Sequence, residues 1–212
     1  MKQEQIRRVN AMLLCLCGES NSGKDSVIRR LQEKGYKRVI SSTTRPKRTG
    51  EKDGIDYYFK TRPDMNPLCF KSYRVASNED WYYWFNKDDI INAIKSDEVH
   101  VCIADADGTI ELEHLGALPV YISVGLEERL RRYYNRESRN KNPNYKEAMR
   151  RLIADIDDFK YIRFRCFELF DMEWANNEGN IEDTVNGIIK LIKLVTEPKD
   201  TNICASKMLR LR

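Results

Sequence analysis

The stretch GESNSGKDS, residues 18–26, follows the apolar run Ala11–Cys17 and precedes a segment with helical periodicity. A strand, a glycine-framed turn and a helix N-terminus together aim several backbone N–H groups at one anion. Gly18 and Gly23 permit positive φ angles and a close approach of the backbone, and Lys24 adds a full positive charge. Two glycines and a lysine at this spacing arise by chance in on the order of 6% of chains this long, and the flanking strand and helix lower that frequency. The pattern therefore predicts a phosphate-binding loop for a nucleoside triphosphate.

One position of this loop departs from the usual pattern. The residue after the lysine is normally a Ser or Thr whose hydroxyl binds Mg²⁺, but here it is Asp25, and a hydroxyl follows only at Ser26. Either Asp25 holds the metal through a water molecule, or it lies outside the ligands of the metal and Ser26 orients the phosphates. We expect ATP and Mg²⁺ to contact Gly18, Ser20, Asn21, Ser22, Gly23, Lys24, Asp25 and Ser26.

The composition limits what the chain can bind. Its 212 residues, 41% of them hydrophobic, suffice for one α/β core with inserted flaps. The 37 basic and 33 acidic residues give a net charge of +4, which describes a mixed surface and no nucleic-acid stripe. Six cysteines without a CxxC pair indicate reduced, structural thiols. The polar start MKQEQIRRVN and the lack of a long apolar segment predict a cytoplasmic protein that binds small molecules and no membrane.

Short apolar runs alternate with helical patterns, which is typical of a parallel sheet wrapped by helices. We therefore predict an α/β fold with five parallel strands and a phosphate loop at the carboxyl edge of the sheet. The predicted strands are Met12–Cys17, Tyr36–Ile40, Val99–Ala104, Pro119–Val124 and Leu169–Trp174, and the predicted covering helices are Lys24–Lys34 and Ile181–Thr196.

Two insertions interrupt this alternation. Residues 41–96 predict a small flap of mixed structure, with strands at Tyr57–Lys60, Phe70–Ala76 and Trp81–Phe85 and a helix at Lys87–Lys95. Residues 126–160 are helical and strongly charged, interrupted by NKNPN, and predict a lid. The core then comprises residues 11–40, 97–125 and 161–197, and the tail 198–212 is expected to be weakly ordered.

A second anion site is indicated by SSTTRPKRTGEKDGIDYYF, residues 41–59. Arg45 and Arg48 offer rigid forks of donors to a phosphate, and the hydroxyl of Tyr57 offers another. This stretch, with the phosphate loop, closely resembles guanylate kinases, whose acceptor segment runs SxTTRxxRxGExxGxDYxF, and every fixed letter is present here. The resemblance covers about residues 11–196.

The resemblance implies a three-layer P-loop kinase core with a nucleoside monophosphate-binding flap and a lid. It also implies that Ser41 contacts the base of GMP, that Arg45, Arg48 and Tyr57 bind its phosphate, and that Glu51 orients the arginines. Without the motif, a solvated loop charge is the ordinary role of such arginines.

The residues that read guanine match less well. Guanylate kinases carry an acidic residue in the strand corresponding to Phe70–Ala76, where this chain has Lys71, Ser72 and Arg74. They carry Tyr, Gly and Ser or Thr in the next strand, and this chain has Tyr83, Trp84 and Phe85. Glu79 or Asp80 substitutes for the acid only if the intervening turn folds inward.

Carboxylates and arginines complete the implied site. Asp105 and Asp107 follow the strand that ends VCIADAD, two residues apart and therefore expected to face the same side, where Asp105 is a further candidate ligand of Mg²⁺. They resemble the aspartate pair near the metal and the acceptor. The alternative is a helix from Gly108 with Asp107 as its N-cap. In the lid, Arg132, Arg136 and Arg151 are the counterparts of catalytic arginines, with Arg139 and Arg150 as substitutes and a solvated charged helix as the alternative. Asn176 resembles the residue that contacts adenine of ATP.

These features predict transfer of the γ-phosphate of Mg-ATP to GMP or dGMP, giving GDP or dGDP and ADP. Two alternatives remain open at this point. One is a kinase for a different nucleoside or deoxynucleoside monophosphate, and the other is a non-catalytic guanylate kinase-like binding module.

Overall fold

A computed structural model describes residues 12–48, 50–63, 67–74, 80–139, 141–160, 173–175 and 181–196, with backbone alone at 70–74 and 173–175. Its larger sheet has five strands in the order β2-β7-β1-β8-β9, and each neighbouring pair is parallel. These strands are β1 (Met12–Cys17), β2 (Lys37–Arg38), β7 (Val99–Ile103), β8 (Leu118–Ser123) and β9 (Glu173–Ala175). The predicted α/β architecture on a parallel sheet is confirmed.

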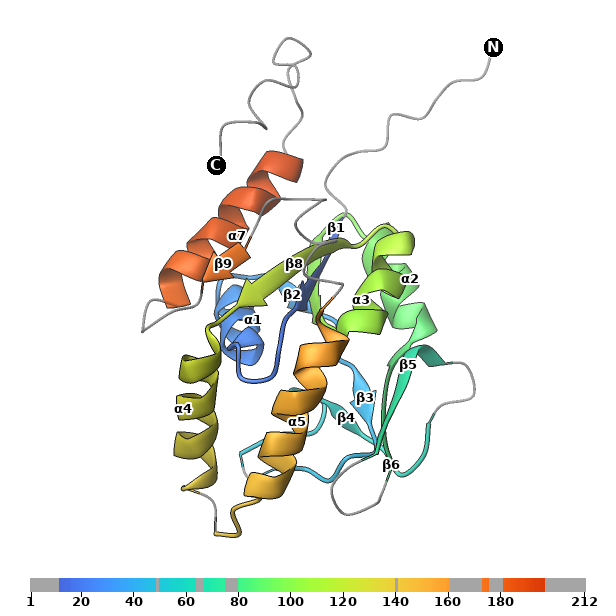
Figure 1. Ribbon diagram of the computed structural model, residues 1–212. Coiled ribbons are helices and arrows are strands. Elements are labelled where there is room, and N and C mark those ends of the chain that lie inside the picture. The colour runs from blue at the N-terminus through green and yellow to red at the C-terminus, as the bar shows by residue number, and fades with distance from the viewer. Residues whose placement is uncertain are drawn as a thin grey trace, which may run out of the picture.

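The central strand β1 explains how the core divides into two layers. All six of its residues are buried, as expected for a parallel strand covered on both faces. Since side chains alternate along a strand, Leu14 and Leu16 pack into one apolar cluster, and Leu13 and Cys15 pack into another. The first cluster contains α1 (Lys24–Glu33) and α7 (Ile181–Thr196), and the second contains α2 (Lys87–Lys95) and α3 (Ala106–His114) (Figure 1).

A smaller sheet lies beside the large one, in the order β4-β3-β6-β5 (Figure 1). It comprises β3 (Ser42–Thr43), β4 (Tyr58–Phe59), β5 (Pro67–Arg74) and β6 (Asp80–Asn86). Strand β5 pairs antiparallel with β6, and the register shifts between Leu68 and Lys71. At this irregularity Cys69 adopts a φ of 53°, which is uncommon for a residue with a side chain.

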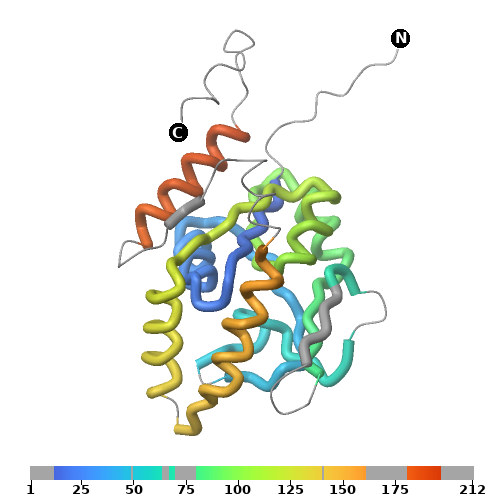
Figure 2. The backbone as a smooth tube through the Cα atoms, viewed as in Figure 1, coloured from blue at the N-terminus to red at the C-terminus, as the bar shows by residue number. Residues whose placement is uncertain are grey.

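Two helices extend from the carboxyl edge of the large sheet. Helix α4 (Leu126–Glu137) follows β8, and helix α5 (Tyr145–Asp158) returns beside it, as the tube in Figure 2 traces. Tyr133, Ala148 and Leu152 form an apolar cluster between the two helices.

Several predicted boundaries differ from the structure. The short strand β3 was absent from the sequence prediction, and β2 is limited to Lys37–Arg38. Helix α2, expected in the 41–96 flap, packs on the large sheet through Ile90 and Ala93. Of the predicted strand Leu169–Trp174, residues 169–172 lie outside the described residues, as does the tail.

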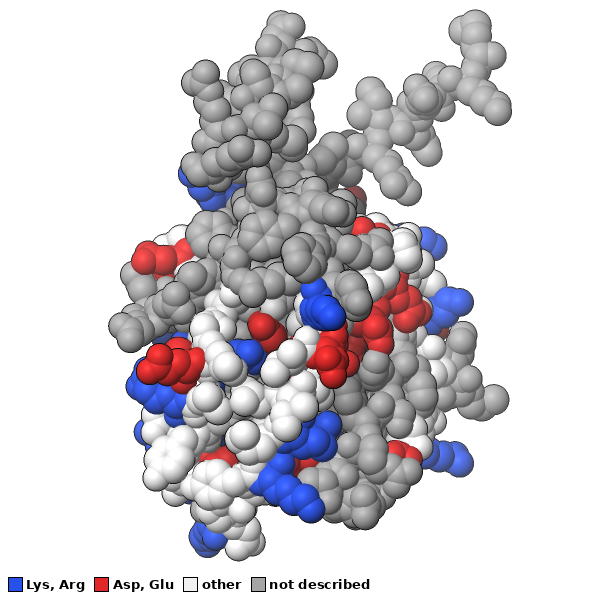
Figure 3. All heavy atoms as spheres, in the orientation of Figure 1, with Lys and Arg blue, Asp and Glu red and all other residues white. Residues whose placement is uncertain are grey.

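Four predicted structural thiols are confirmed as free and buried, at Cys15, Cys17, Cys69 and Cys102, whereas Cys166 and Cys204 fall outside the described ranges. Among the described helices, none has the length and apolar character needed to cross a membrane. Basic and acidic side chains are interspersed on the face shown in Figure 3.

Candidate active site

The phosphate loop connects β1 to α1 at the carboxyl edge of the large sheet. Gly18 has a φ of 143°, and a Cβ atom there would lie 2.3 Å from the carbonyl oxygen of Ile122 in β8, so only glycine fits. Gly23, with a φ of 96°, is the N-cap of α1. Because it has no side chain, it leaves the first amides of the helix without a side-chain cap. The first amides of α1 are therefore directed at the loop, where an anion can accept from them.

Lys24 folds back over this loop. Its Nζ donates to the carbonyl oxygens of Gly18 and Glu19, at 2.7 and 2.9 Å, and to Oγ of Ser22 at 3.3 Å. Burial lowers the pKa of Lys24, against the opposing effect of nearby carboxylates such as Asp25 and Asp155. The ammonium group thus lies where a phosphate bound by the loop would meet it.

A buried carboxylate on α5 holds the other side of the loop. Asp155 accepts from the backbone N–H of Ser20 at 2.8 Å and from its hydroxyl at 3.1 Å. Arg129 of α4 donates to the same carboxylate at 3.0 Å, and a second nitrogen of its guanidinium lies 3.7 Å from the carboxylate of Glu19. Burial raises the pKa of Asp155, although the Ser20 bonds and the charges of Lys24 and Arg129 oppose the shift. The loop is therefore tied to both α4 and α5.

Three of the predicted lid arginines face the loop or the space beside it. Arg132 donates to the carbonyl oxygen of Asn21 at 3.2 Å, and Arg136 donates to its side-chain oxygen at 2.9 Å. With Arg151, they line a cavity of about 550 Å³ that also borders Lys24 and Arg48. Of the suggested substitutes, Arg150 lines a second, smaller cavity, and Arg139 is exposed and lines neither.

The acceptor segment contributes an oriented pair of arginines. Glu51 accepts from the guanidinium of Arg45 at 2.8 Å and from the backbone N–H of Arg48 at 2.8 Å. Arg45 is buried, 5.3 Å from the ring centre of Tyr57. Desolvation lowers the pKa of Arg48 to about 10, and the positive charges of Arg151, Arg45 and Arg136 act in the same direction. Cations collected around an open cavity create a positive potential suited to a phosphate.

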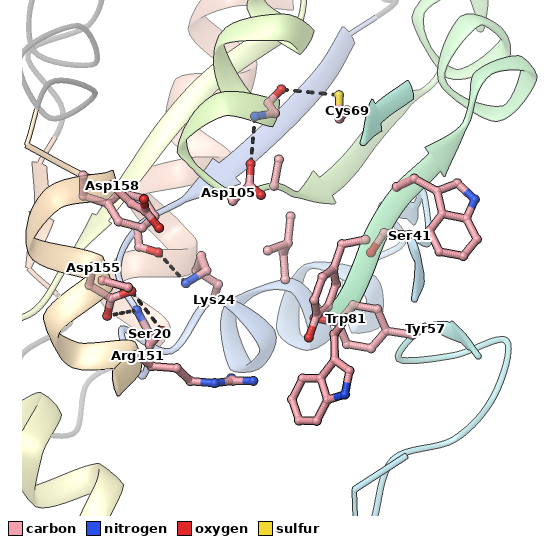
Figure 4. A pocket seen from close by; sticks show the side chains of 18 of the residues that line it. Ser20, Lys24, Ser41, Tyr57, Cys69, Trp81, Asp105, Arg151, Asp155 and Asp158 are labelled. Carbon is pink, nitrogen blue, oxygen red and sulfur yellow. Dashed lines mark hydrogen bonds between the residues drawn. The ribbon is translucent and has the colours of Figure 1, made fainter. Parts of the chain in front are cut away.

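The smaller cavity, of about 200 Å³, lies beside the larger one, and Ser20, Lys24, Tyr57 and Arg151 border both. Figure 4 shows Arg151 extending from α5 toward the side that carries Tyr57 and Trp81. Other lining residues are Ser41, Cys69, Tyr83, Trp84, Phe85 and Asp105.

Cys69 and Asp105 meet at the start of α3. The thiol of Cys69 donates to the carbonyl oxygen of Gly108 at 3.5 Å, and Asp105 accepts from the Gly108 N–H at 2.8 Å (Figure 4). Burial raises the pKa of the Cys69 thiol, so it is a neutral, weakly polar group. Cys69 was not among the residues singled out from the sequence.

Comparison with known proteins decides the family. Residues 10–193 match the family model described as guanylate kinase. The chain belongs to the guanylate kinase family. Its fold also matches the crystal structure of guanylate kinase from Anaplasma phagocytophilum, with a TM-score of 0.61, 19% identity and coverage of 90% of this chain and 89% of that one.

Two curated guanylate kinases are similar in sequence. Guanylate kinase 2, chloroplastic/mitochondrial, of Oryza sativa subsp. japonica is 28% identical over 191 residues, which cover 85% of this chain and 63% of the rice protein. This chain thus spans less than two thirds of that relative. The guanylate kinase of Hydrogenovibrio crunogenus is 27% identical over 176 residues, covering 78% of this chain and 80% of the relative.

The predicted aspartate pair of this guanylate kinase family member is divided by the start of α3. Strand β7 ends at Ile103 and α3 begins at Ala106, so Asp105 is the N-cap, and the alternative that gave this role to Asp107 is wrong. Asp107 lies in the first helical turn, exposed and outside both cavities, whereas Asp105 borders the smaller one. The expectation that both face one side is therefore corrected, because a helix replaces the extended backbone it assumed.

Of the three magnesium ligands proposed from the sequence, two border the larger cavity together, whereas Asp105 borders the smaller one. Asp25 and Ser26 are exposed at the start of α1 and border the larger cavity. In the parts of the chain that the structure describes, no three His, Cys, Asp or Glu side chains gather as a metal site. The carboxylate of Asp25 and the hydroxyl of Ser26 suit Mg²⁺, which commonly takes one or two protein oxygens together with substrate phosphates and water.

The structure brings together most of the predicted site. The residues bordering at least one cavity are Gly18, Ser20, Asn21, Gly23, Lys24, Asp25, Ser26, Ser41, Arg48, Tyr57, Tyr83, Asp105, Arg132, Arg136 and Arg151. Ser22, Arg45 and Glu51 lie behind them as supporting contacts. Asp80, a suggested guanine reader, is exposed and lines neither cavity. Asn176, Glu79 and the side chains of Lys71, Ser72 and Arg74 lie outside the described residues.

Proposed function

We propose that this protein transfers the γ-phosphate of Mg-ATP to GMP or dGMP, giving GDP or dGDP and ADP. The observation that carries this proposal is the opposition of two anion-binding groups across one cavity. Lys24 and the amides of the phosphate loop border it from one side, and Arg48 and Tyr57 of the acceptor segment border it from the other. A donor and an acceptor phosphate held this way are positioned for in-line transfer.

The residues of this chain then act by positioning and charge neutralisation. Lys24 exchanges its carbonyl contacts for the phosphates of ATP, and Arg48 holds the acceptor phosphate. The buried Arg45, oriented by Glu51, adds positive charge behind it. Arg132, Arg136 and Arg151 neutralise the charge that spreads over the transferred group, and the helices that carry them exclude water. Mg²⁺, held by Ser26 and Asp25, would supply further neutralisation of the phosphates.

The lining of the smaller cavity favours a second candidate acceptor, a nucleoside monophosphate with another base. Guanine presents N–H donors along one edge, and acceptors must meet them for strong selection. With Ser41, the lining includes the neutral thiol of Cys69 and the ring of Trp84. Its carboxylates include Asp105, which already accepts from the Gly108 N–H. The indole N–H of Trp81 is buried and has no partner among the described residues, so it is available to a carbonyl oxygen of a ligand.

The test is ADP release with Mg-ATP and each ribo- and deoxyribonucleoside monophosphate in turn. We expect turnover with GMP or dGMP above that with the other acceptors. Higher turnover with another base would reassign the acceptor and keep the phosphotransfer. No turnover with any monophosphate, although ATP binds, would leave the binding-module alternative in place of the kinase.

A further inference from the structure

An apolar surface covers the outer sides of α4 and α5. Of the eleven large hydrophobic side chains exposed in the described part of the chain, seven lie on these two helices. They recur every three or four residues, which places them on one face of each helix. The residues are Leu126, Leu130 and Tyr134 on α4, and Tyr145, Met149, Ile153 and Ile156 on α5.

The two stripes form one surface. The rings of Tyr134 and Tyr145 stack with their centres 6.2 Å apart and join the helices near the loop between them. Figure 3 shows a largely uncharged area over α4 and α5, with charged side chains mainly toward its margins. Arg151 and Asp155, which face the phosphate loop, lie on a different side of α5. Covering this surface therefore leaves the two cavities open.

The size of the surface lies at the upper end of what a monomer usually exposes. Ile153 and Ile156 are each 60% exposed, and Tyr134 is 65% exposed. With about 100 to 200 Å² for each fully exposed aliphatic or aromatic side chain, the seven together expose roughly 400 to 700 Å². The largest apolar patch of a typical monomer is about 300 to 600 Å². A stable interface buries about 800 Å² on each partner. Together with its polar margin, the surface therefore approaches the size that a dimer requires.

The pattern along α5 is self-complementary, which favours a second copy of the chain as the occupant. We propose that this surface binds a second copy of the chain, with the two α5 helices antiparallel about a two-fold axis near residue 151. Tyr145 then meets Ile156 of the second copy, and Met149 meets Ile153 of the second copy.

The charges beside the stripe fit the same register. Lys146 and Asp157 are exposed and eleven residues apart, close to three helical turns, so they flank the stripe on the same side. In the antiparallel pair, Lys146 faces Asp157 of the second copy, once at each end of the interface. An unrelated partner or another segment of this chain has no reason to match this symmetric arrangement.

The mass of the full chain in solution tests the proposal, by light scattering after size-exclusion chromatography over a range of concentrations. We expect twice the 25.0 kDa of one chain. Ile153→Arg should weaken the dimer at least about tenfold, because it places a charge in the apolar contact. The matched control, Leu194→Arg on α7, replaces a side chain that is 49% exposed outside the surface and should leave the dimer intact.

A charge reversal tests the two-fold register. Lys146→Asp and Asp157→Lys should each weaken the dimer, because each places like charges opposite one another, and the double variant should restore it. Circular dichroism checks that all variants remain folded. A single-chain mass at every concentration, a dimer that survives Ile153→Arg, or a double variant weaker than both single variants would overturn the proposal. None of these measurements depends on nucleotide binding or turnover.

Discussion

Asp155 binds both the backbone N–H and the hydroxyl of Ser20, across 135 residues of sequence. The contact fixes α5 against the phosphate loop, and Arg151 lies one turn earlier on that helix, bordering both cavities. Through Arg129, the same carboxylate connects α4 to the loop. The positions of the loop and of the arginine-bearing helices are therefore coupled.

Loss of Asp155 is predicted to destabilise the fold. Asp155→Ala leaves the buried Arg129 with Glu19, at 3.7 Å, as its ion-pair partner among the described residues, and removal of one member of a buried pair typically costs about 3 to 5 kcal/mol. Adding Arg129→Leu should recover part of this loss, because the arginine is then no longer a buried charge without Asp155. Denaturant unfolding of both single variants and the double variant measures the coupling. Additive effects would show that the two groups do not act as a pair.

Lys24 is predicted to govern turnover. Lys24→Ala should lower kcat by roughly 10²- to 10³-fold, as removal of one preorganised donor to a developing negative charge typically does. The control is Lys34→Ala at the end of α1, an exposed lysine whose partner is Glu182 on α7. Near-normal steady-state turnover of the Lys24 variant would remove the assignment of the donor site.

Arg136 and Arg139 provide a matched test of the lid. Arg136→Ala should lower kcat by about 10²-fold, because its guanidinium borders the larger cavity and contacts Asn21. Arg139→Ala, at an exposed position three residues later, should leave kcat near the parent value. Equal effects of the two substitutions on kcat would indicate that the overall positive charge of the helix matters, and not the position of the Arg136 guanidinium.

Glu51 is predicted to contribute stability that depends on pH. Burial acts to raise its pKa, but the bonds from Arg45 and the Arg48 amide outweigh this and hold the pKa below its ordinary value of 4.5. A lowered folded-state pKa means that the contribution is complete above about pH 4.5 and is lost as the pH falls through the folded-state pKa.

Glu51→Gln should therefore reduce the free energy of unfolding by about 1 to 3 kcal/mol near neutral pH, as hydrogen bonds to charged groups do. The difference from the parent should shrink in acid below pH 4.5. Unfolding curves at several pH values measure it, with Glu98→Gln in an exposed pair with Lys37 as the control. A difference that is constant from neutral pH to strong acid would exclude the ionised carboxylate as its source.

The features that sequence predicts well here depend on local chemistry. Gly18, Gly23 and Lys24 must follow a strand and open a helix to bind a phosphate, so their spacing alone places them. The motif that contains Arg45 and Glu51 is similarly compact, and the structure joins these two directly. Element types were also predictable from the alternation of apolar runs.

The missed features depend on partners far along the chain. The sequence around Asp155 and Arg129 does not indicate that the two side chains are buried against each other. That burial arises only when α4 and α5 pack on the loop. The sequence named Asp107 as the N-cap of a helix from Gly108, but α3 begins two residues earlier, at Ala106, with Asp105 as its N-cap. Cys69 borders the smaller cavity at an irregularity in the pairing of β5 with β6, which the hydrophobic periodicity of the sequence does not reveal.

The close approach of Gly18 to the carbonyl of Ile122 packs the phosphate loop directly on β8. That strand ends at Ser123, and α4 starts at Leu126. A rotation of α4 that leaves the loop in place would therefore occur at Val124 and Gly125. Val124 is buried, whereas Gly125 has open space around its α-carbon.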